Sequence, residues 1–326
     1  MLIDINEYLK TDFDVIFDVR SPREFEQSHI PGAKNFYVLN NEEHAEIGYI
    51  YKQISKKEAS KKGLVYILRN IASHLEKTKD LYGKKILIYC SRGGKRSESL
   101  YTILSHLNLN VFRLKGGYKA YRSYVSDYFQ NLPHKKFIVL RGNSGCGKSE
   151  LIEKLTPSID LEKLANHYGS TFGIRGVQPS QKMFENMLFE KIRKIDKNEY
   201  IFIEAESSKI GKLLIPGVLK KRMEEGIQVE ITAALEQRIE RIIKYYGNID
   251  KKNFYANLEK LKKFISKSTY ERLIENYNNE NLKKVAEIML LEYYDKVYKK
   301  KEADFSVENV DLKKSVEKLL EIKNSL

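Results

Sequence analysis

Residues 137–155 read FIVLRGNSGCGKSELIEKL: an apolar run, a glycine-rich loop and the start of a helix. The loop fits the pattern G-x-x-x-x-G-K-[ST], in which backbone N–H groups wrap a phosphate and the lysine neutralises it. A strand before the loop and a helix after it are the context that this chemistry needs. The stretch therefore predicts an α/β domain with a phosphate site, and a plain glycine-rich turn is the alternative. The predicted phosphate-binding residues are Gly142, Asn143, Ser144, Gly145, Cys146, Gly147, Lys148 and Ser149.

Some side chains in and near this loop have more than one interpretation. Lys148 is expected to neutralise phosphate, and Ser149 is a candidate Mg²⁺ ligand. A later apolar strand, EYIFIEAE, ends at Glu204 and Glu206, where an acidic group often accompanies such a loop. Either glutamate could hold a water on Mg²⁺ or could simply cap the strand. Cys146 is either a small residue tolerated in the loop or a group with a redox or transfer role.

A second loop, nearer the N-terminus, carries the other cysteine. The apolar strand KKILIYC ends at Cys90, and SRGGKRS follows before a helix begins. In that place the thiol faces loop N–H groups and the positive end of the helix dipole, with two arginines nearby. These effects favour the nucleophilic thiolate, whereas a cysteine that merely fills a strand end is the alternative. The candidate catalytic residues are Cys90, Arg92, Gly93, Gly94 and Arg96.

Short apolar runs alternate with helical segments in the N-terminal part of the chain. FDVIFDV (13–19), KKILIYC (84–90) and NVFRL (110–114) have strand length, and helical stretches separate them. Such alternation predicts a parallel sheet with helices on both faces, and the same order begins again at the phosphate loop. The predicted ranges are 1–128 for the first domain, 129–235 for the phosphate-loop domain and 236–326 for a helical C-terminal region.

The bulk composition limits the class of protein. The chain has 326 residues, a formal charge of +14 and only two cysteines, too few for a disulfide framework. No apolar run approaches the ~18 residues of a membrane span, and no signal peptide is evident, so a cytoplasmic protein is expected. The excess of Lys and Arg suits a polyanionic partner such as nucleic acid. Compositional drift, as in proteins from AT-rich genomes, is the alternative explanation.

The N-terminal part resembles the rhodanese family. DVRSPREFEQSHIPGA (18–33) is similar to the rhodanese signature, and KGGY (115–118) is similar to the glycine pair that closes such domains. The resemblance implies that Cys90 carries a chalcogen, as a persulfide does in rhodaneses. Arg96 follows the cysteine at six residues instead of five, which is also the Cys-x5-Arg spacing of protein phosphatases. The wider loop could therefore admit a larger oxyanion, either selenophosphate or a phosphoester.

Stretches outside these motifs resemble the family of bacterial tRNA 2-selenouridine synthases. LNNEEH (39–44) with GYIYKQ (48–53) is similar to an insertion special to that family, and so are IDLE (159–162) and LANHYGS (164–170). Tyr168 departs from the pattern, since an arginine is expected there. The resemblance implies supporting roles for Asp160, His167, Ser170, Glu204 and Glu206.

This resemblance also implies a two-step reaction on tRNA. Such an enzyme would attach a geranyl group from geranyl diphosphate to the sulfur of a wobble 2-thiouridine and then replace S-geranyl with selenium from selenophosphate. Cys90 would carry selenium as an S-selanylcysteine, and the phosphate loop, with Lys148, would hold the prenyl diphosphate. No tightly bound cofactor is expected, and Ser149 is only a candidate site for Mg²⁺. The anticodon stem-loop of tRNA is the expected substrate, and an enzyme that supplies selenophosphate is a candidate partner.

The basic C-terminal region mixes lysines with tyrosines, in the stretch QRIERIIKYYGNIDKKNFYANLEKLKKFI and beyond. Cations and rings of this kind can hold phosphates and stack on unpaired bases. A solvated helix surface with core tyrosines explains the pattern equally well. The predicted tRNA-binding residues are Lys244, Lys251, Lys252, Lys262 and Lys263.

Two rival functions fit parts of the sequence. One is a P-loop kinase or ATPase fused to a phosphatase-like Cys-x5-Arg domain, which predicts nucleotide turnover and phosphate release from a phosphoester. The other is a tRNA-binding or sulfur-sensing module without catalysis, and the intact Cys90, Lys148 and Ser149 argue against it.

Overall fold

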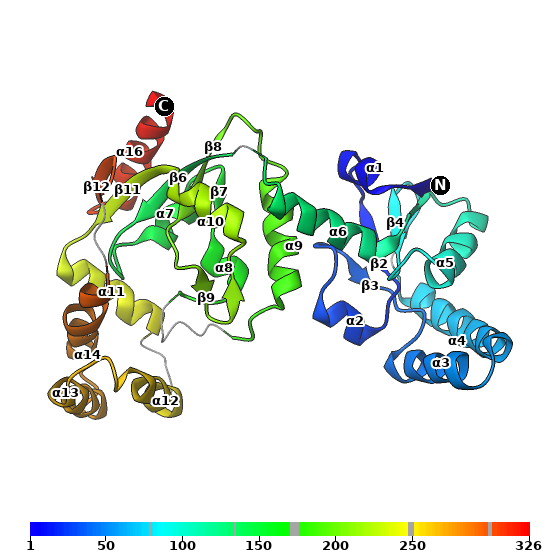
Figure 1. Cartoon of the computed structure of the whole chain (residues 1–326), viewed down its shortest axis with the longest axis horizontal. Helices are drawn as coiled ribbons and strands as arrows, with labels where there is room; N and C mark the ends of the chain where they lie inside the picture. The colour runs from blue at the N-terminus through cyan, green and yellow to red at the C-terminus, as the bar shows by residue number, and fades with distance from the viewer. Residues whose placement is uncertain (79, 134, 170–175, 247–250, 299–301) are drawn as a thin grey trace. The chain divides into compact units, whose positions relative to one another are not determined.

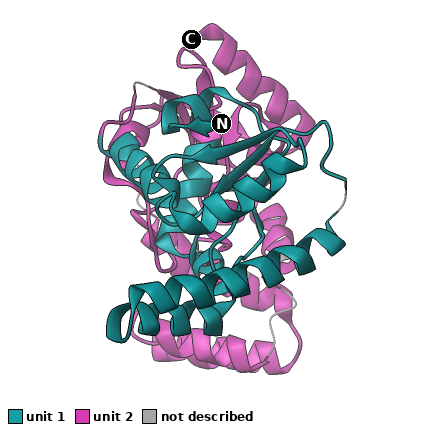
Figure 2. Ribbon diagram, turned by 90° about the vertical axis from the view of Figure 1, so that its right-hand side faces the viewer, with its two compact units in different colours: residues 1–130, 179–190 teal, residues 131–178, 191–326 magenta. Residues whose placement is uncertain are grey.

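The computed structural model describes residues 1–78, 80–133, 135–169, 176–246, 251–298 and 302–326. The chain forms two compact units, each built around its own five-stranded parallel sheet (Figure 2). The predicted α/β class is therefore confirmed. Unit 1 comprises residues 1–130 and 179–190, and unit 2 comprises residues 131–178 and 191–326. The predicted ranges 1–128, 129–235 and 236–326 differ from this division after residue 178 and in the C-terminal region.

The sheet of unit 1 has the strand order β1-β5-β4-β2-β3, and every neighbouring pair is parallel. All four residues of the central strand β4 are buried, as expected for a strand covered by helices on both faces. Cys90 follows this strand directly, so the position of the thiol is set by the most buried strand of the unit. The strands are β1 (Leu2–Ile3), β2 (Val15–Asp18), β3 (Lys34–Asn35), β4 (Ile86–Tyr89) and β5 (Val111–Leu114).

Helices surround this sheet, and α3 and α4 lie side by side (Figure 1). The last helix of the unit comes from far along the chain: the first ten residues of α9 belong to unit 1. Asn186 on α9 is fully buried, and its Nδ2 donates to the carbonyl of His29 (2.8 Å) and the hydroxyl of Tyr118 (2.9 Å). A buried amide needs such partners, which explains why this helix packs with unit 1. The helices are α1 (Ile5–Lys10), α2 (Pro22–Gln27), α3 (Asn41–Gln53), α4 (Lys56–Lys77), α5 (Lys95–His106), α6 (Gly117–Gln130) and α9 (Gln181–Ile192).

The sheet of unit 2 has the strand order β12-β11-β6-β8-β7, again with parallel pairs throughout. Its edge strand β12 comes from the C-terminal region, and Leu319 and Ile322 of the last helix are buried in the same core as Leu151. The region 236–326 is therefore not purely helical, because its final part completes the α/β core. The strands are β6 (Lys136–Arg141), β7 (Ser158–Ile159), β8 (Tyr200–Glu204), β11 (Ile227–Thr232) and β12 (Phe305–Glu308), with a separate hairpin of β9 (Lys209–Ile210) and β10 (Leu213–Leu214).

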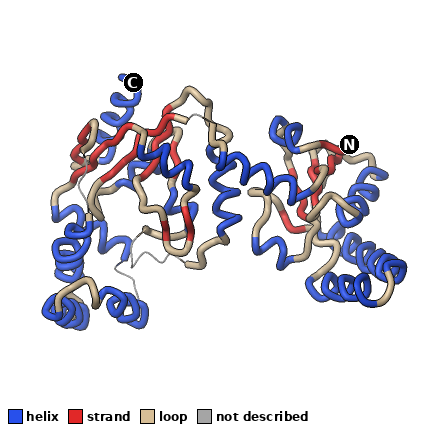
Figure 3. The backbone as a smooth tube through the Cα atoms, viewed as in Figure 1, coloured by secondary structure: helices blue, strands red, loops and turns tan. Residues whose placement is uncertain are grey.

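Helices pack around the second sheet as well (Figure 3). Three further helices, α12 to α14, pack around a separate core that includes Phe254, Leu258, Leu273 and Ile288. None of the described helices combines the length and the apolar character that crossing a membrane requires. The helices are α7 (Lys148–Lys154), α8 (Leu161–Ala165), α10 (Gly217–Glu224), α11 (Leu235–Tyr246), α12 (Lys251–Leu261), α13 (Lys267–Asn278), α14 (Leu282–Met289), the π-helical turn η1 (Leu290–Tyr294), α15 (Asp295–Val297) and α16 (Leu312–Ser325).

Candidate functional site

The Cys90 thiol lies at the carboxyl end of β4, beside the start of α5. It is 3% exposed, and its Sγ accepts a hydrogen bond from the Gly94 N–H at 3.2 Å. The hydroxyl of Ser97 lies 3.3 Å from the same sulfur. The loop therefore presents a backbone N–H, a hydroxyl and a helix N-terminus to the sulfur, an arrangement that stabilises negative charge.

The glycine pair at 116–117 supports the cysteine loop from behind. The N–H of Tyr118 donates to the Cys90 carbonyl at 2.8 Å. Gly117 has φ +57°, and a Cβ there would lie 2.2 Å from the same carbonyl oxygen. Only glycine allows this close approach, so the match to the closing glycine pair has a direct physical reason.

The two arginines of the loop lie in different surroundings. Arg92 is exposed, and no ion pair is described for it. Arg96 is bound by Glu24 of α2, with 2.6 Å between Nη1 and Oε2, and its Nη2 donates to the Ser91 hydroxyl at 3.0 Å. Burial by itself would raise the pKa of Glu24, but the hydrogen bonds and charge of Arg96 outweigh burial and lower that pKa to about 2. Glu24 was missed as a site residue, although it lies within the rhodanese signature.

The phosphate loop connects β6 to α7, as predicted. Lys148 folds back across it and donates from Nζ to the Gly142 carbonyl at 2.8 Å. Gly147 has φ +93°, and a Cβ there would meet the Asn309 amide nitrogen at 2.3 Å. That amide donates to the Cys146 carbonyl at 2.9 Å. Cys146 is 1% exposed and packs in the core, which fits a small buried residue better than an accessible thiol.

C-terminal elements hold the outer side of the phosphate loop. Arg238 of α11 donates to the Ser144 carbonyl at 2.9 Å and pairs with Asp295 at 2.6 Å. Asp295 in turn accepts a hydrogen bond from the Asn143 side chain at 2.9 Å. The sequence did not predict these residues. They lie more than ninety positions from the phosphate loop, and no local sequence pattern connects them with it.

Three carboxylates gather at the Ser149 end of the loop. Glu162, Glu204 and Glu206 each offer an oxygen within 4.8 Å of the others. The Ser149 hydroxyl donates to Glu162 at 3.1 Å and lies 3.4 Å from Glu204. Burial raises the pKa of Glu162 to about 8 and raises the pKa of Glu204 well above its usual value. Buried carboxylates this close cannot all carry charge, so the cluster holds either protons or a cation.

The other supporting residues have structural contacts. Asp160 caps α8 by accepting a hydrogen bond from the Lys163 N–H at 2.7 Å. His167 is buried, its pKa is lowered by burial, and its Nδ1 accepts from the Gly169 N–H at 3.1 Å. Ser170 lies outside the described residues. Glu162, which sequence reasoning did not single out, occupies the position closest to Ser149.

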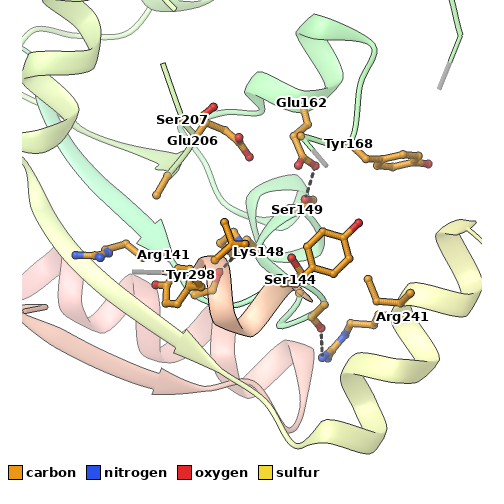
Figure 4. Close-up of a pocket in the computed structure, with 18 of the residues that line it drawn as sticks. Arg141, Ser144, Lys148, Ser149, Glu162, Tyr168, Glu206, Ser207, Arg241 and Tyr298 are labelled. Atoms are coloured by element: carbon orange, nitrogen blue, oxygen red, sulfur yellow. Dashed lines mark hydrogen bonds between the residues drawn. The ribbon is translucent and has the colours of Figure 1, made fainter. Parts of the chain in front are cut away.

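A cavity of about 650 Å³ opens over the phosphate loop. In Figure 4, Lys148 and Ser149 lie near its centre, and Glu162 and Glu206 lie above them. The cavity also has an apolar wall, of which Tyr168 lies beside Glu162 and Tyr298 lies near Lys148 in Figure 4. Its side chains are Tyr168, Ile242, Tyr293, Tyr294, Val297 and Tyr298. One cavity therefore joins a polar phosphate cradle to a wall that suits a ring or a hydrocarbon chain.

Two family models match the chain: a tRNA 2-selenouridine synthase AAA domain over residues 135–266 and a rhodanese-like domain over residues 4–124. The tRNA 2-selenouridine synthase of Hydrogenovibrio crunogenus is 31% identical over 317 residues, which cover 87% of this chain and 88% of the relative. The chain belongs to the tRNA 2-selenouridine synthase family. The relatives of that name from Sulfurovum sp. and Nitrosomonas europaea are 35% and 34% identical, over 69% and 71% of this chain and 64% and 63% of their own lengths. The resemblance predicted from the sequence is confirmed.

The lysines predicted to bind tRNA are exposed in this member of the tRNA 2-selenouridine synthase family. Lys251 and Lys252 begin α12, and Lys262 and Lys263 follow its end. Lys262 lies 3.6 Å from Glu259 and 5.2 Å from the centre of the Tyr270 ring. Lys263 lies over the exposed ring of Phe264 at 5.0 Å. Lys244, on α11, lies 3.6 Å from Glu150. These positions are accessible, and their role toward tRNA stays a prediction.

We expect the stability of this family member to depend on pH through Glu162. Burial raises its pKa from 4.5 to about 8, so between these values the folded chain holds a proton that the unfolded chain has released. The free energy of unfolding therefore falls as pH rises from about 5 to about 8. Replacing Glu162 with Gln should raise the melting temperature at pH 8 by about 3 °C or more and leave it nearly unchanged at pH 5.

Thermal unfolding in EDTA at both pH values measures this effect. Glu153→Gln, at an exposed position of α7, is the matched control and should shift neither melting temperature. Equal shifts at pH 5 and pH 8 for Glu162→Gln would show that the effect comes from packing and not from the proton.

Proposed function

We propose that the chain is an enzyme that converts 2-thiouridine in tRNA to 2-selenouridine through an S-geranyl intermediate. The observation that carries this proposal is the cavity of about 650 Å³, whose lining combines a phosphate cradle with an aromatic and apolar wall. A prenyl diphosphate has this combination of a charged head and a hydrocarbon tail. The thiol loop of unit 1 supplies the second activity that the reaction needs.

In the first step, the 2-thio sulfur attacks C1 of geranyl diphosphate. A C–S bond forms, the C–O bond breaks, and diphosphate leaves with the bonding electrons, while the base releases its N3 proton. Lys148 and the N–H groups at the start of α7 would neutralise the charge that develops on the diphosphate. Ser149, Glu162, Glu204 and Glu206 offer oxygen ligands of the kind that Mg²⁺ prefers, so they fit a Mg²⁺ ion that binds the same diphosphate.

The apolar wall favours a prenyl donor over a free phosphate. Burial of a hydrocarbon chain contributes about 0.8 kcal/mol per CH₂ group. Tyr293 and Val297 come from the segment that follows α14, and Asp295, between them, is bound to the phosphate loop through Asn143. The ion pair of Asp295 with Arg238, which also donates to the Ser144 carbonyl, therefore fixes this segment to the phosphate loop.

In the second step, selenium replaces the S-geranyl group. Overall, S-geranyl-tRNA, selenophosphate and water give seleno-tRNA, geranylthiol and phosphate. Selenium stays at the selenide level in this exchange: its bond to phosphorus breaks, a bond to C2 of the base forms, and the S-geranyl group leaves as geranylthiol. We assign this step to the loop of Cys90, whose sulfur faces the Gly94 N–H and the start of α5. Arg92 and Lys95 are the exposed cations of this stretch, so both are accessible to an arriving anion.

Mass analysis of nucleosides tests the proposal. The protein would be incubated with 2-thiolated tRNA, geranyl diphosphate and selenophosphate, and each component would be left out in turn. S-Geranyl-2-thiouridine should accumulate without selenophosphate, and 2-selenouridine should require all components. Formation of 2-selenouridine at full rate without geranyl diphosphate would contradict the order of steps.

A second candidate function is nucleotide turnover at the same loop. The proximity of Ser149 to three carboxylates favours it, because Mg²⁺ with a nucleoside triphosphate would fit there as well. Phosphate release from ATP or GTP in the absence of tRNA and geranyl diphosphate would support this alternative. Its absence alongside geranyl transfer would exclude it.

The C-terminal lysines should give tRNA binding a strong salt dependence. Charge reversal at Lys262 and Lys263 removes two exposed cations near aromatic rings. We expect weaker tRNA binding and a plot of log K against log salt that is flatter by about 1 to 2. Filter binding at several salt concentrations measures both, with Lys10→Glu on α1 as a control. An unchanged slope would place the tRNA contact elsewhere.

A further inference from the structure

The Cys90 loop has the length of a phosphatase loop but a different arrangement of charge. In a Cys-x5-Arg loop that cradles phosphate, the arginine must face the anion. Here both Nη atoms of Arg96 face the Glu24 carboxylate, at 2.6 Å and 3.3 Å. The side chains of Arg96 and Glu24 are 18% and 25% exposed, so the pair lies at the surface of the loop and not deep in the core.

Several groups fix the carboxylate of Glu24 in this position. The Ser91 hydroxyl donates to Oε1 at 2.6 Å, and the N–H of Ser21 donates to Oε2 at 3.1 Å. These contacts and Arg96 lower the pKa of Glu24 to about 2, so its carboxylate stays ionised throughout the neutral range. His44 of α3 lies 3.9 Å from Oε2, and its pKa is lowered by burial and by Arg96, so it adds no full charge at neutral pH.

We propose that Glu24 is a specificity-determining residue of the Cys90 site: it occupies the face of Arg96 that would hold phosphate or a phosphoester. An arriving selenophosphate then meets the exposed Arg92 and Lys95 instead, and the phosphate that is released is not retained. The loop then leaves Cys90 available for a chalcogen and does not retain inorganic phosphate or phosphoesters. This role goes beyond the proposed function, and it rests on that function only for the claim that phosphate is released near the loop.

The energetic case follows from the strength of charge-assisted hydrogen bonds. A hydrogen bond to a charged group contributes about 1.5–3 kcal/mol, and 1.4 kcal/mol corresponds to a factor of ten in affinity. An oxyanion that binds Arg96 must first displace Glu24 and leave its carboxylate without that partner. Removal of the carboxylate charge should therefore strengthen oxyanion binding at least about tenfold.

Calorimetric titration with tungstate tests this inference. Wild type and Glu26→Gln, at an exposed position of the same helix, should bind tungstate weakly and alike. Glu24→Gln, which keeps the shape but not the charge, should bind it at least about tenfold more tightly. Protection of Cys90 from iodoacetamide, located by peptide mass analysis, would place the anion at the loop.

A double variant separates specificity from loop damage. Adding Arg96→Gln to Glu24→Gln should return tungstate binding to the wild-type level. If Glu24→Gln does not fold, Glu24→Asp is used instead. The shorter aspartate cannot reach both Nη atoms of Arg96, so this variant should also bind tungstate more tightly than wild type. Equal affinity in the folded variant and wild type, or tight binding by wild type, would overturn the inference. No selenophosphate or tRNA is present, so the outcome is independent of whether the proposed function holds.

Discussion

Replacement of Cys90 with alanine should abolish 2-selenouridine formation and leave S-geranyl-2-thiouridine to accumulate in tRNA. The thiol is the group that the N–H of Gly94 and the hydroxyl of Ser97 face, and no other described cysteine lies in unit 1. Without the nucleophile, the selenium step should slow by about 10³-fold or more, whereas the geranyl step at unit 2 should keep its rate.

The measurement is the time course of both nucleosides by mass analysis, with Ser99→Ala on α5 as the matched control. Supplying tRNA that already carries S-geranyl-2-thiouridine should not rescue the Cys90 variant. If the variant makes 2-selenouridine at the wild-type rate, selenium does not pass through Cys90.

Replacement of Lys148 with alanine should block the first step instead. Its ammonium group lies at the phosphate loop. Burial by itself would lower its pKa, but Cys146 and the carboxylates of Glu206, Glu162 and Glu204 together raise that pKa. Loss of one charged group that stabilises a leaving group typically costs about 10²–10³ in rate. We therefore expect geranyl transfer to fall by that factor, with 2-thiouridine left unchanged.

A substrate bypass makes this prediction specific. Lys148→Ala should still convert tRNA that already carries S-geranyl-2-thiouridine, which the Cys90 variant cannot do. Lys154→Ala, exposed on the same helix, is the control and should keep full geranyl transfer. Unimpaired geranylation by Lys148→Ala would separate the phosphate loop from the prenyl donor.

Local sequence was sufficient for the two loops, because each is a strand followed by glycines and a helix. The strand before Cys90 and the strand before the phosphate loop were both expected, and the structure has them as β4 and β6. The glycine pair at 116–117 could also be read from sequence, since only glycine fits against the Cys90 carbonyl. Contacts of this kind depend on a few neighbouring residues and a fixed backbone shape.

Long-range packing decided the parts that the sequence did not predict. The C-terminal region is helical, as expected, but it also contains β12, which pairs with β11 and completes the sheet. Helix α9 lies within the predicted range of the phosphate-loop domain, yet its buried Asn186 finds its partners in unit 1. No local pattern specifies such pairings, because strand order and burial depend on which surfaces remain uncovered after the rest of the chain has folded.

The sequence alone determined the α/β class, the family and the two loops, because short-range spacing dictates strand, turn and helix at each of them. Tertiary structure alone decided the surroundings of the loops: Glu24 on Arg96, Glu162 beside Ser149, and the aromatic wall that lines the same cavity as Lys148. Glu24 is 72 positions from Arg96 in the sequence, and Glu162 is 13 positions from Ser149. Only the folded chain brings the members of each pair together. Charge compensation and burial, which set what each loop can bind, arise at that level.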